Sequence, residues 1–266
     1  MIDRFGRPIT YLRVSVTDRC NLRCTYCMPP EGVPLLAHED ILSFEEIAAV
    51  VREAAGLGIW KVRLTGGEPL VRRGIVELVR MLAGVPGIRE LAMTTNGTLL
   101  GRFAADLKAA GLMRVNVSLD AIDPEAYARI TRGGDVGAVL AGIDAAVAAG
   151  LLPVKLNCVV SKSSAEADAR DVARYGEARG LEVRFIHRMD LQSGAFSVVE
   201  GGTGGDCRLC NRLRLTSDGH VRPCLFSDLR FSVRELGPRR ALLDAVAAKP
   251  PVGTTCNGDF MKRIGG

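Results

Sequence analysis

Three cysteines near the beginning of the chain are spaced so that one metal cluster could bind them together. Cys20, Cys24 and Cys27 form a CxxxCxxC pattern directly after an apolar segment that reads as a strand. A structural zinc site takes four ligands, and His38 is the nearest histidine, well outside the pattern. Three thiolates suit a [4Fe–4S] cluster that keeps one iron without a protein ligand. That iron is open to a small molecule that chelates it.

A second group of three cysteines lies in the last quarter of the sequence. Cys207, Cys210 and Cys224 are spaced CxxCx13C, with no fourth cysteine adjacent to them. A second iron–sulfur cluster is one interpretation, and a zinc ion completed by Cys256 or His220 is the alternative. Because six of the eight cysteines fall in these two groups and no secretion signal is recognisable, we expect metal ligation in a reducing compartment instead of disulfides.

The bulk properties fit one large α/β domain, or one domain with an appendage. The chain has 266 residues, of which 47% are hydrophobic and 24% charged, enough for a sizeable core. No run of about 18 apolar residues occurs, so we expect a cytoplasmic protein without a membrane span. A net charge of +5 fits a solvated basic surface or an anionic ligand such as a nucleotide phosphate. Nucleic acid is not expected as a partner, since no basic stripe is interleaved with aromatic residues.

Strand and helix patterns alternate along the first two-thirds of the chain. Short runs of Val, Leu and Ile bounded by Gly, Asp or Asn predict six strands, at Tyr11–Val16, Lys61–Thr65, Glu90–Thr94, Arg114–Leu119, Pro153–Val160 and Glu182–Ile186. The segments between them predict helices at Ser43–Gly56, Arg73–Leu82, Gly101–Ala110, Pro124–Ile130, Gly137–Ala149 and Ala165–Ala178. Ser43 and Glu46 form a capping box at the first helix.

Six β–α units in a row predict a parallel sheet with helices outside it. Since a closed barrel needs eight units, we expect an α/β fold of the partial (β/α)6 TIM-like barrel type with a C-terminal iron–sulfur extension. The chemically interesting segments follow strand ends, where such folds place their active sites. They are Asp18–Cys27, Gly66–Pro69, Thr95–Gly97 and Asp120.

The character of the sequence changes after Asp190. We expect three parts: a partial barrel at 1–190, a Gly- and Ser-rich linker or mobile loop at 191–206, and an extension with the second cysteine group at 207–266. Within the extension, Ser217–His220 predicts a hairpin-like turn and Ala241–Ala248 a short helix. An extension of this size would not hold its own core without a metal.

Two motifs resemble the radical S-adenosylmethionine (SAM) superfamily. The segment Cys20-Asn-Leu-Arg-Cys24-Thr-Tyr26-Cys27 is similar to its cluster signature, and Gly66-Gly67-Glu68-Pro69 is similar to its GGEP motif. The resemblance implies that SAM binds the open iron through its amino and carboxylate groups, with the GGEP backbone at the amino group. It also implies reductive cleavage to a 5′-deoxyadenosyl radical, with an electron donor such as a flavodoxin or ferredoxin.

The surroundings of the second cysteine group resemble the GTP 3′,8-cyclase family of molybdenum cofactor biosynthesis. The resemblance rests on Cys210-Asn-Arg212-Leu-Arg214-Leu-Thr-Ser-Asp-Gly, on Tyr11-Leu-Arg13-Val-Ser-Val-Thr-Asp-Arg-Cys20 and on the terminal Gly265-Gly266. It implies that a second [4Fe–4S] cluster binds the guanine of GTP. The radical then takes the C3′ hydrogen, and C3′ attacks C8 to give 3′,8-cyclo-GTP in a lyase reaction, the first step of the pathway.

The same resemblance implies roles for individual residues. At SAM it places Tyr26, Gly66, Gly67, Glu68, Ser118 and Met189. At GTP it places Arg13, Lys61, Arg63, Thr94, Lys155, Arg212, Leu213 and Arg214. It gives catalytic roles to Arg184, Arg212, Arg214, Gly265 and Gly266. Cations at strand ends that converge on a triphosphate, with an arginine pair able to make bidentate contacts, are chemically consistent with these roles.

The segment before the second cysteine group departs from the family pattern. Only 191–206 separates it from the barrel, whereas family members usually carry several tens more residues there. The chain is therefore a compact cyclase, or a paralogue acting on another nucleotide, metabolite or peptide with the second cluster as an electron relay. If Cys256 ligates that cluster, its open iron disappears. A non-enzymatic iron–sulfur or zinc module is the rival from another class, and a homodimer is compatible with the sequence.

Overall fold

A curved sheet of nine strands forms the centre of the molecule in this computed structural model, which describes residues 1–257 and Ile264. The strand order is β6-β5-β4-β3-β2-β1-β7-β8-β9. The first six strands are β1 (Tyr11–Ser15), β2 (Lys61–Thr65), β3 (Glu90–Thr95), β4 (Arg114–Ser118), β5 (Lys155–Val160) and β6 (Glu182–His187), and all pair in parallel. The six predicted strands are confirmed. β5 begins at Lys155 because Pro153 has no N–H group to donate to a neighbouring strand.

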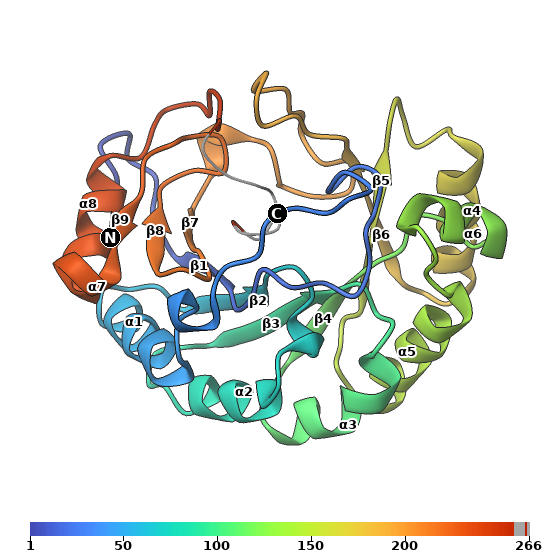
Figure 1. Cartoon of the computed structure of the whole chain (residues 1–266), viewed down its shortest axis with the longest axis horizontal. Helices are drawn as coiled ribbons and strands as arrows, with labels where there is room; N and C mark the ends of the chain where they lie inside the picture. The colour runs from blue at the N-terminus through green and yellow to red at the C-terminus, as the bar shows by residue number, and fades with distance from the viewer. Residues whose placement is uncertain (258–263, 265–266) are drawn as a thin grey trace.

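Helices surround the strands on their outer side (Figure 1). They are α1 (Phe44–Gly56), α2 (Ile75–Ala83), α3 (Leu100–Ala109), α4 (Pro124–Thr131), α5 (Val136–Ala148), α6 (Ala167–Ala178), α7 (Val233–Leu236) and α8 (Pro238–Ala247). The predicted capping box begins α1, where the Ser43 hydroxyl accepts from the Glu46 N–H and the Glu46 carboxylate accepts from the Ser43 N–H. The result is the expected partial barrel, with one helix or two between successive strands.

The C-terminal part of the chain continues the same sheet. β7 (Arg212–Leu215) pairs in parallel with β1, and β8 (His220–Arg222) and β9 (Phe231–Ser232) add antiparallel strands beyond it. The predicted turn joins β7 to β8, and the predicted short helix is α8, which contacts α1. The cysteines of the extension are therefore carried by the barrel wall itself.

Each parallel strand has one apolar and one polar face, because successive side chains point to opposite sides of a sheet. On β1 and β2, the outward residues Leu12, Val14, Val62 and Leu64 are fully buried in the core beneath the helices. The alternate residues, such as Arg13 and Arg63, face the inside of the barrel. The alternation of side chains along the strands thus separates an apolar core, covered by the helices, from a polar barrel interior.

The Gly-rich segment 191–206 forms a loop against the edge strand β6. Phe185 and Glu200 exchange backbone hydrogen bonds, each 3.0 Å long. Gly205 has a φ of +84°, and a Cβ atom there would lie 2.1 Å from the Ser197 carbonyl oxygen. Glycine is therefore required where the loop folds back on itself. This loop closes one side of the barrel that six units leave open.

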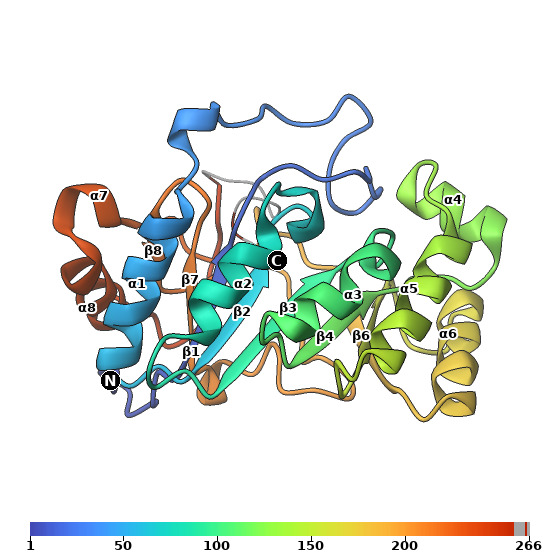
Figure 2. The same cartoon turned by 90° about the horizontal axis from the view of Figure 1, so that it is seen from below.

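The loop between β1 and α1 crosses the carboxyl ends of the strands and carries the first cysteine group. In Figure 2 it runs in blue along the top edge of the molecule. It contains the short 3-10 helix η1 (His38–Asp40). None of the helices in the described part of the chain is long and apolar enough to span a bilayer.

Candidate active site

A cavity of about 550 Å³ occupies the polar interior of the partial barrel, within the size range typical of small-molecule sites. It is lined by the inward faces of β1 to β7 and by the loops at their carboxyl ends. Both cysteine groups open into it, namely Cys20, Cys24, Cys27, Cys207, Cys210 and Cys224. The two candidate clusters therefore share one chamber.

The first cysteine group is held on a tight turn. The Cys24 carbonyl accepts hydrogen bonds from the N–H groups of Cys27 at 2.9 Å and Met28 at 3.2 Å. Burial, followed by nearby carboxylates and thiols, raises the pKa of Cys20 to about 11 and that of Cys24 to about 12. These thiols are protonated at neutral pH in the cluster-free protein, so iron has to displace their protons on binding.

The Gly66–Pro69 turn lies directly against the cysteine loop. The N–H of Gly67 donates to the Thr17 carbonyl and that of Glu68 to the Arg19 carbonyl, both at 2.8 Å. A Cβ atom on Gly67 would lie 2.3 Å from the Arg19 carbonyl oxygen, so glycine is needed for this approach. Since its N–H groups are used in this way, the motif has carbonyl oxygens to offer an ammonium group.

The Glu68 side chain faces away from the cavity and holds the next loop in place. Its carboxylate accepts from the Leu70 N–H at 3.0 Å, the Thr95 hydroxyl at 2.8 Å and the Asn96 N–H at 2.7 Å. The side chain is 1% exposed. Burial raises the pKa of Glu68 to about 7, although these hydrogen bonds oppose the shift. Glu68 is thus a positioning residue within the motif.

Tyr26 connects the cysteine loop to the opposite wall of the barrel. Its hydroxyl donates to the Asp120 carboxylate at 2.7 Å, and the other Asp120 oxygen accepts from the Val159 N–H at 2.8 Å. Burial raises the pKa of Asp120. Together with Glu68, this carboxyl places acidic groups around the first cysteine group.

Cations dominate the rest of the cavity wall. Arg13 lies opposite Arg63 on β2 and opposite Arg214 on β7, so three neighbouring strands present one row of guanidinium groups. Ten Lys and Arg residues line the cavity against two Asp residues. Burial opposes ionisation of Tyr11, yet Arg63 and its neighbouring cations lower the pKa of Tyr11. The strongly positive field suits a polyanion.

Two carboxylates orient four of these cations. Glu90 pairs with Lys61 at 3.2 Å and with Arg114 on the adjacent strand. Glu182 pairs with Lys155 and Arg184 across β5 and β6. Arg63 donates to the Thr94 hydroxyl at 3.4 Å. The cations therefore have fixed directions along the strands.

The second cysteine group has the opposite electrostatic surroundings. Cys207 begins the short helix η3 (Cys207–Leu209), Cys210 follows it, and Cys224 follows β8. Burial opposes ionisation of Cys210, but the cations of Lys249 and Arg212 outweigh it and lower the pKa of this thiol to about 7. Cys210 therefore favours its thiolate form even without a metal.

Both cysteine groups are compatible with a cubane cluster. No group of three His, Cys, Asp or Glu side chains is arranged around one metal position within residues 1–257 and Ile264. Each thiolate of a cubane binds a different iron, so its sulfurs need not converge on one point. Neither of the residues considered as a fourth zinc ligand, His220 and Cys256, is among the described residues that line the cavity. His220 lies 3.2 Å from Asp218 instead.

The structure brings most of the predicted site residues together around this cavity. These are Arg13, Tyr26, Lys61, Arg63, Gly66, Gly67, Thr94, Ser118, Lys155, Arg184, Met189, Arg212 and Arg214. Leu213 is an exception, because its side chain is fully buried on the core side of β7 and only its backbone remains available. Gly265 and Gly266 lie outside the described residues.

The lining residues that the sequence did not single out include Arg114, Asn116, Asn157 and Lys249. The first three occupy inward positions two or four residues from predicted ones on the same strand, so strict alternation from Ser118 and Lys155 would have found them. Lys249 follows α8 and has no motif around it that could have marked it.

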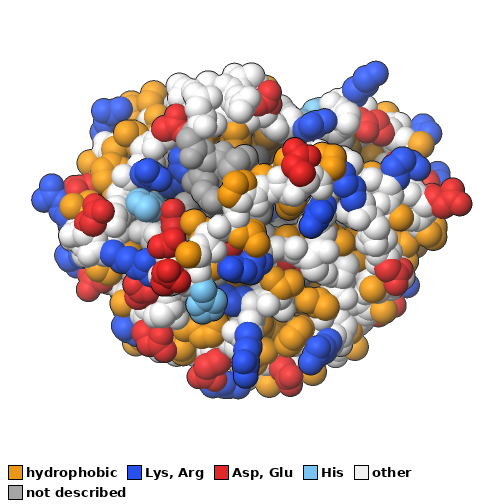
Figure 3. All heavy atoms as spheres, viewed as in Figure 1, with side chains coloured by type: hydrophobic (Ala, Val, Ile, Leu, Met, Phe, Trp, Pro, Cys, Tyr) orange, Lys and Arg blue, Asp and Glu red, His pale blue; other side chains and the backbone are white. Residues whose placement is uncertain are grey.

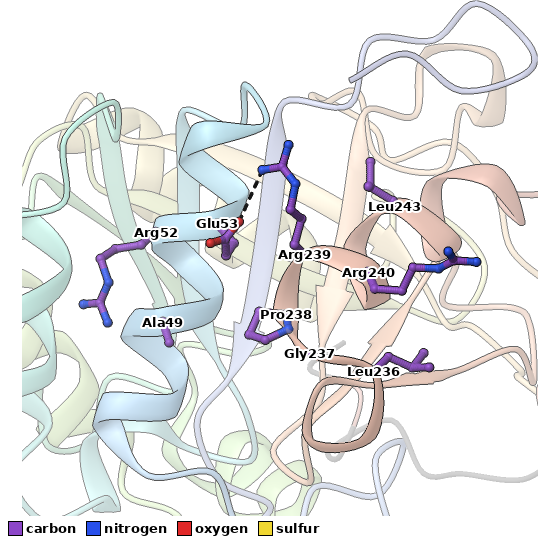
Figure 4. A pocket seen from close by; sticks show the side chains of 9 residues that line it. All are labelled: Ala49, Arg52, Glu53, Leu236, Gly237, Pro238, Arg239, Arg240 and Leu243. Carbon is purple, nitrogen blue, oxygen red and sulfur yellow. Dashed lines mark hydrogen bonds and ion pairs between the residues drawn. The ribbon is translucent and has the colours of Figure 1, made fainter.

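The outer surface offers a second hollow with different chemistry. It lies between α1 and the α7–α8 corner, where Arg239 pairs with Glu53 at 3.4 Å beside Arg52 and Arg240 (Figure 4). The face drawn in Figure 3 mixes acidic and basic side chains in the same way. Exposed ion pairs of this kind contribute little to stability. The cysteines and the row of arginines therefore mark the central cavity as the active site.

The partial barrel, the CxxxCxxC loop and the GGEP turn define a radical SAM fold, and the pattern of the radical SAM superfamily matches residues 14–176. GTP 3′,8-cyclase of Moorella thermoacetica is 45% identical over 286 aligned positions, which cover 91% of this chain and 88% of that protein. GTP 3′,8-cyclase of Petrotoga mobilis is 40% identical over 323 positions, with full coverage of both chains. This chain belongs to the GTP 3′,8-cyclase family of the radical SAM superfamily.

Solved structures with low sequence identity share the fold. Native anSMEcpe with bound AdoMet is 15% identical with a TM-score of 0.64, covering 91% of this chain and 81% of that one. Streptococcus suis SuiB bound to precursor peptide SuiA is 14% identical with a TM-score of 0.66, covering 92% and 66%. The Petrotoga alignment has 323 positions for 266 residues, so 57 of them fall opposite gaps in this chain.

Proposed function

We propose that this chain converts GTP to 3′,8-cyclo-GTP in a lyase reaction, the first step of molybdenum cofactor biosynthesis. The observation that carries the proposal is the joint position of two cysteine triads and a row of buried arginines in one cavity. The family membership gives the same answer independently. The cavity offers cations for a triphosphate, the second cysteine group for a purine and the first cysteine group for SAM.

SAM and the first [4Fe–4S] cluster lie at the acidic end of the cavity in this proposal. When bound, they supply the 5′-deoxyadenosyl radical that takes the C3′ hydrogen of GTP. Cys20, Cys24 and Cys27 hold the cluster. Gly66, Gly67, Tyr26, Ser118 and Met189 border the space for SAM. The carboxyl group of Asp120, which lines the cavity, suits its positively charged sulfonium.

The triphosphate binds the cationic side of the chamber. Arg13, Arg63 and Arg214 are adjacent in the sheet register and can reach neighbouring phosphate oxygens with bidentate geometry. Lys61 and Lys155 are oriented by their carboxylate partners. Arg184 and Arg212 complete the ring on β6 and β7. This fixed frame holds the ribose still, so that C3′ and C8 of the same nucleotide approach each other.

Cys207, Cys210 and Cys224 would hold a second [4Fe–4S] cluster, and an iron without a protein ligand would offer a coordination position to the guanine. The proposal requires that Cys256 is not a ligand, because a fourth thiolate would close that iron. We also propose that the terminal Gly265 and Gly266 act at the site. In this proposal the triphosphate binds at β1, β2 and β7, and the base binds at the second cluster. The ribose between them then faces SAM.

The reaction also needs a one-electron donor, and we propose a flavodoxin or ferredoxin in the cytoplasm. A net charge of +5 favours acidic partners of this type. Six thiolate ligands need the reducing conditions of that compartment. A homodimer is compatible with the proposal, since the cavity is built from one chain.

The short loop 191–206 favours one alternative, a paralogue that acts on another nucleotide. The experiment that distinguishes this alternative also tests the main proposal. The anaerobically reconstituted protein is incubated with SAM, a reductant and GTP deuterated at C3′, and with ATP in parallel. We expect 5′-deoxyadenosine formation that depends on GTP and carries deuterium. SAM cleavage that is indifferent to GTP, or greater with ATP, would contradict the cyclase.

A further inference from the structure

Lys249 is buried between the two segments that carry Cys210 and Cys224. Its side chain is 1% exposed. Its ammonium group donates to the Arg212 carbonyl at 2.8 Å and to the Pro223 carbonyl at 2.6 Å. The first carbonyl is two residues after Cys210, and the second immediately precedes Cys224. One side chain thus ties both cysteine segments together at the cavity wall.

Arg7 holds the third cysteine in a related way. It donates to the Cys207 carbonyl at 2.7 Å and to the carbonyls of Pro250 and Pro251 at 2.6 and 3.1 Å. Its charge is balanced by Asp3, whose carboxylate lies 2.6 Å away. Arg7 therefore holds the Cys207 segment while its own charge is balanced by Asp3. Lys249, in contrast, adds a net positive charge beside the second cysteine group.

The charge of Lys249 has no carboxylate partner among residues 1–257 and Ile264. Burying a cation in this way is costly unless an anion accompanies it. Burial lowers the pKa of Lys249, while Cys210 and Cys224 act in the opposite direction. Three thiolates around a cubane carry a net negative charge that grows by one on reduction. The cation is placed where that charge would develop.

We propose that Lys249 is the positioning residue and counter-ion of the second cluster, favouring its reduced state. This rests on the second cluster proposed above. A fixed positive charge in a dry site stabilises the more negative of two redox states. Lys249 therefore makes the second cluster easier to reduce.

The test uses the full-length chain with Cys20, Cys24 and Cys27 all changed to Ala, so that only the second cluster remains. In this parent, Lys249→Met removes the charge at similar side-chain length and Lys249→Arg keeps it. Lys108→Met is the matched control, because Lys108 also donates to a backbone carbonyl, that of Gly150, but on the exposed surface. Iron content and the midpoint potential, by titration followed with electron paramagnetic resonance, are measured for each.

We expect about four irons per chain in the parent and in the Lys108→Met and Lys249→Arg variants. Lys249→Met should make reduction at least tenfold less favourable, a shift of about 59 mV to lower potential for one electron. If Lys249→Met loses the cluster, its retention in Lys249→Arg supports the role of charge. Loss from both variants, or an unchanged potential in Lys249→Met, overturns the inference. A parent without iron contradicts the second cluster itself.

Discussion

Arg13 on β1 and Arg214 on β7 lie directly opposite each other in the parallel register. About 200 residues separate them in the sequence, yet both side chains enter the same cavity. Burial, with repulsion from Arg214 next, holds the pKa of Arg13 well below its usual range. Such a juxtaposition of buried cations is explained by an anionic ligand. The N-terminal strand and the extension therefore form one binding site.

The first prediction concerns this pair. Arg13→Ala or Arg214→Ala removes charge-assisted contacts worth about 1.5–3 kcal/mol, so GTP should bind about 10- to 150-fold more weakly. Calorimetric titration of the cluster-loaded protein with GTP gives the dissociation constant. Arg174→Ala is the control, since Arg174 makes an exposed pair with Asp171 and should bind GTP normally. Equal affinity for GTP in all three variants would show that the triphosphate does not bind to this row of arginines.

The second prediction concerns the tyrosine that bridges the cavity. Tyr26→Phe leaves one oxygen of the buried Asp120 carboxylate without its 2.7 Å donor. The free energy of unfolding should fall by about 1.5–3 kcal/mol, the range for hydrogen bonds to charged groups. Urea denaturation of the cluster-free protein measures it. Tyr175→Phe is the matched control, because the Tyr175 hydroxyl has no hydrogen-bond partner among residues 1–257 and Ile264, and it should cost nothing.

The sequence predicted the elements well because each has a local cause. Alternating side chains specify β1 to β6, and Ser43 with Glu46 begins α1. The cysteine loop and the GGEP turn follow strand ends, where the fold gathers them. The pairing of β7 with β1 could not be predicted in the same way, because strand pairing across about 200 residues leaves no local pattern.

Other features depended on tertiary structure. Glu68 belongs to a recognised motif, but its three hydrogen bonds bind it to the loop after β3 and not to a ligand. Leu213 sits between two inward arginines and therefore points outward into the core. Lys249 is marked only by its burial and its two carbonyl partners. The spacing of residues in the sequence identifies the candidate ligands, whereas the residues that position them are recognised only from their burial and contacts in the structure.

A third prediction follows from the contrasting thiols. The pKa of Cys210 is about 7 and that of Cys20 about 11, so at pH 8 most Cys210 and almost no Cys20 is thiolate in the cluster-free protein. Alkylation by iodoacetamide should be about 10- to 20-fold faster at Cys210, because the ratio of thiolate fractions, about 900, is reduced about 40- to 100-fold by the lower nucleophilicity of its thiolate. Peptide mass spectrometry resolves the two rates. Similar rates at pH 8 would contradict the charge difference between the two sites.

A fourth prediction addresses Cys256. Its thiol is 1% exposed and accepts from Arg222 at 3.3 Å, behind the cavity wall. Cys256→Ala should leave the iron content unchanged while lowering the free energy of unfolding by about 1–3 kcal/mol, since it removes a buried acceptor. Cys224→Ala, in comparison, should lose the second cluster. Loss of iron from Cys256→Ala equal to that from Cys224→Ala would make Cys256 a ligand.

A fifth prediction concerns the pH dependence of stability through Glu68. Its pKa is raised to about 7 in the folded protein, against about 4.3 for an unperturbed glutamate. The folded state therefore binds the extra proton between these values. The contribution of Glu68 to stability should fall as pH rises from about 4.5 to 7, by up to about 1.4 kcal/mol per pH unit, and stay constant above that.

Glu68→Gln isolates this contribution because it cannot ionise. The amide can accept at one oxygen only, so it leaves Asn96 or the Leu70–Thr95 pair without an acceptor and costs about 1–3 kcal/mol at low pH. That deficit relative to the unaltered chain should shrink from pH 5 to pH 7, since only the unaltered chain loses stability through this group. Urea denaturation of both cluster-free proteins at pH 5, 6, 7 and 8 measures the difference, in which all other titrations cancel. A deficit that grows with pH would mean that the hydrogen bonds outweigh burial and keep Glu68 ionised.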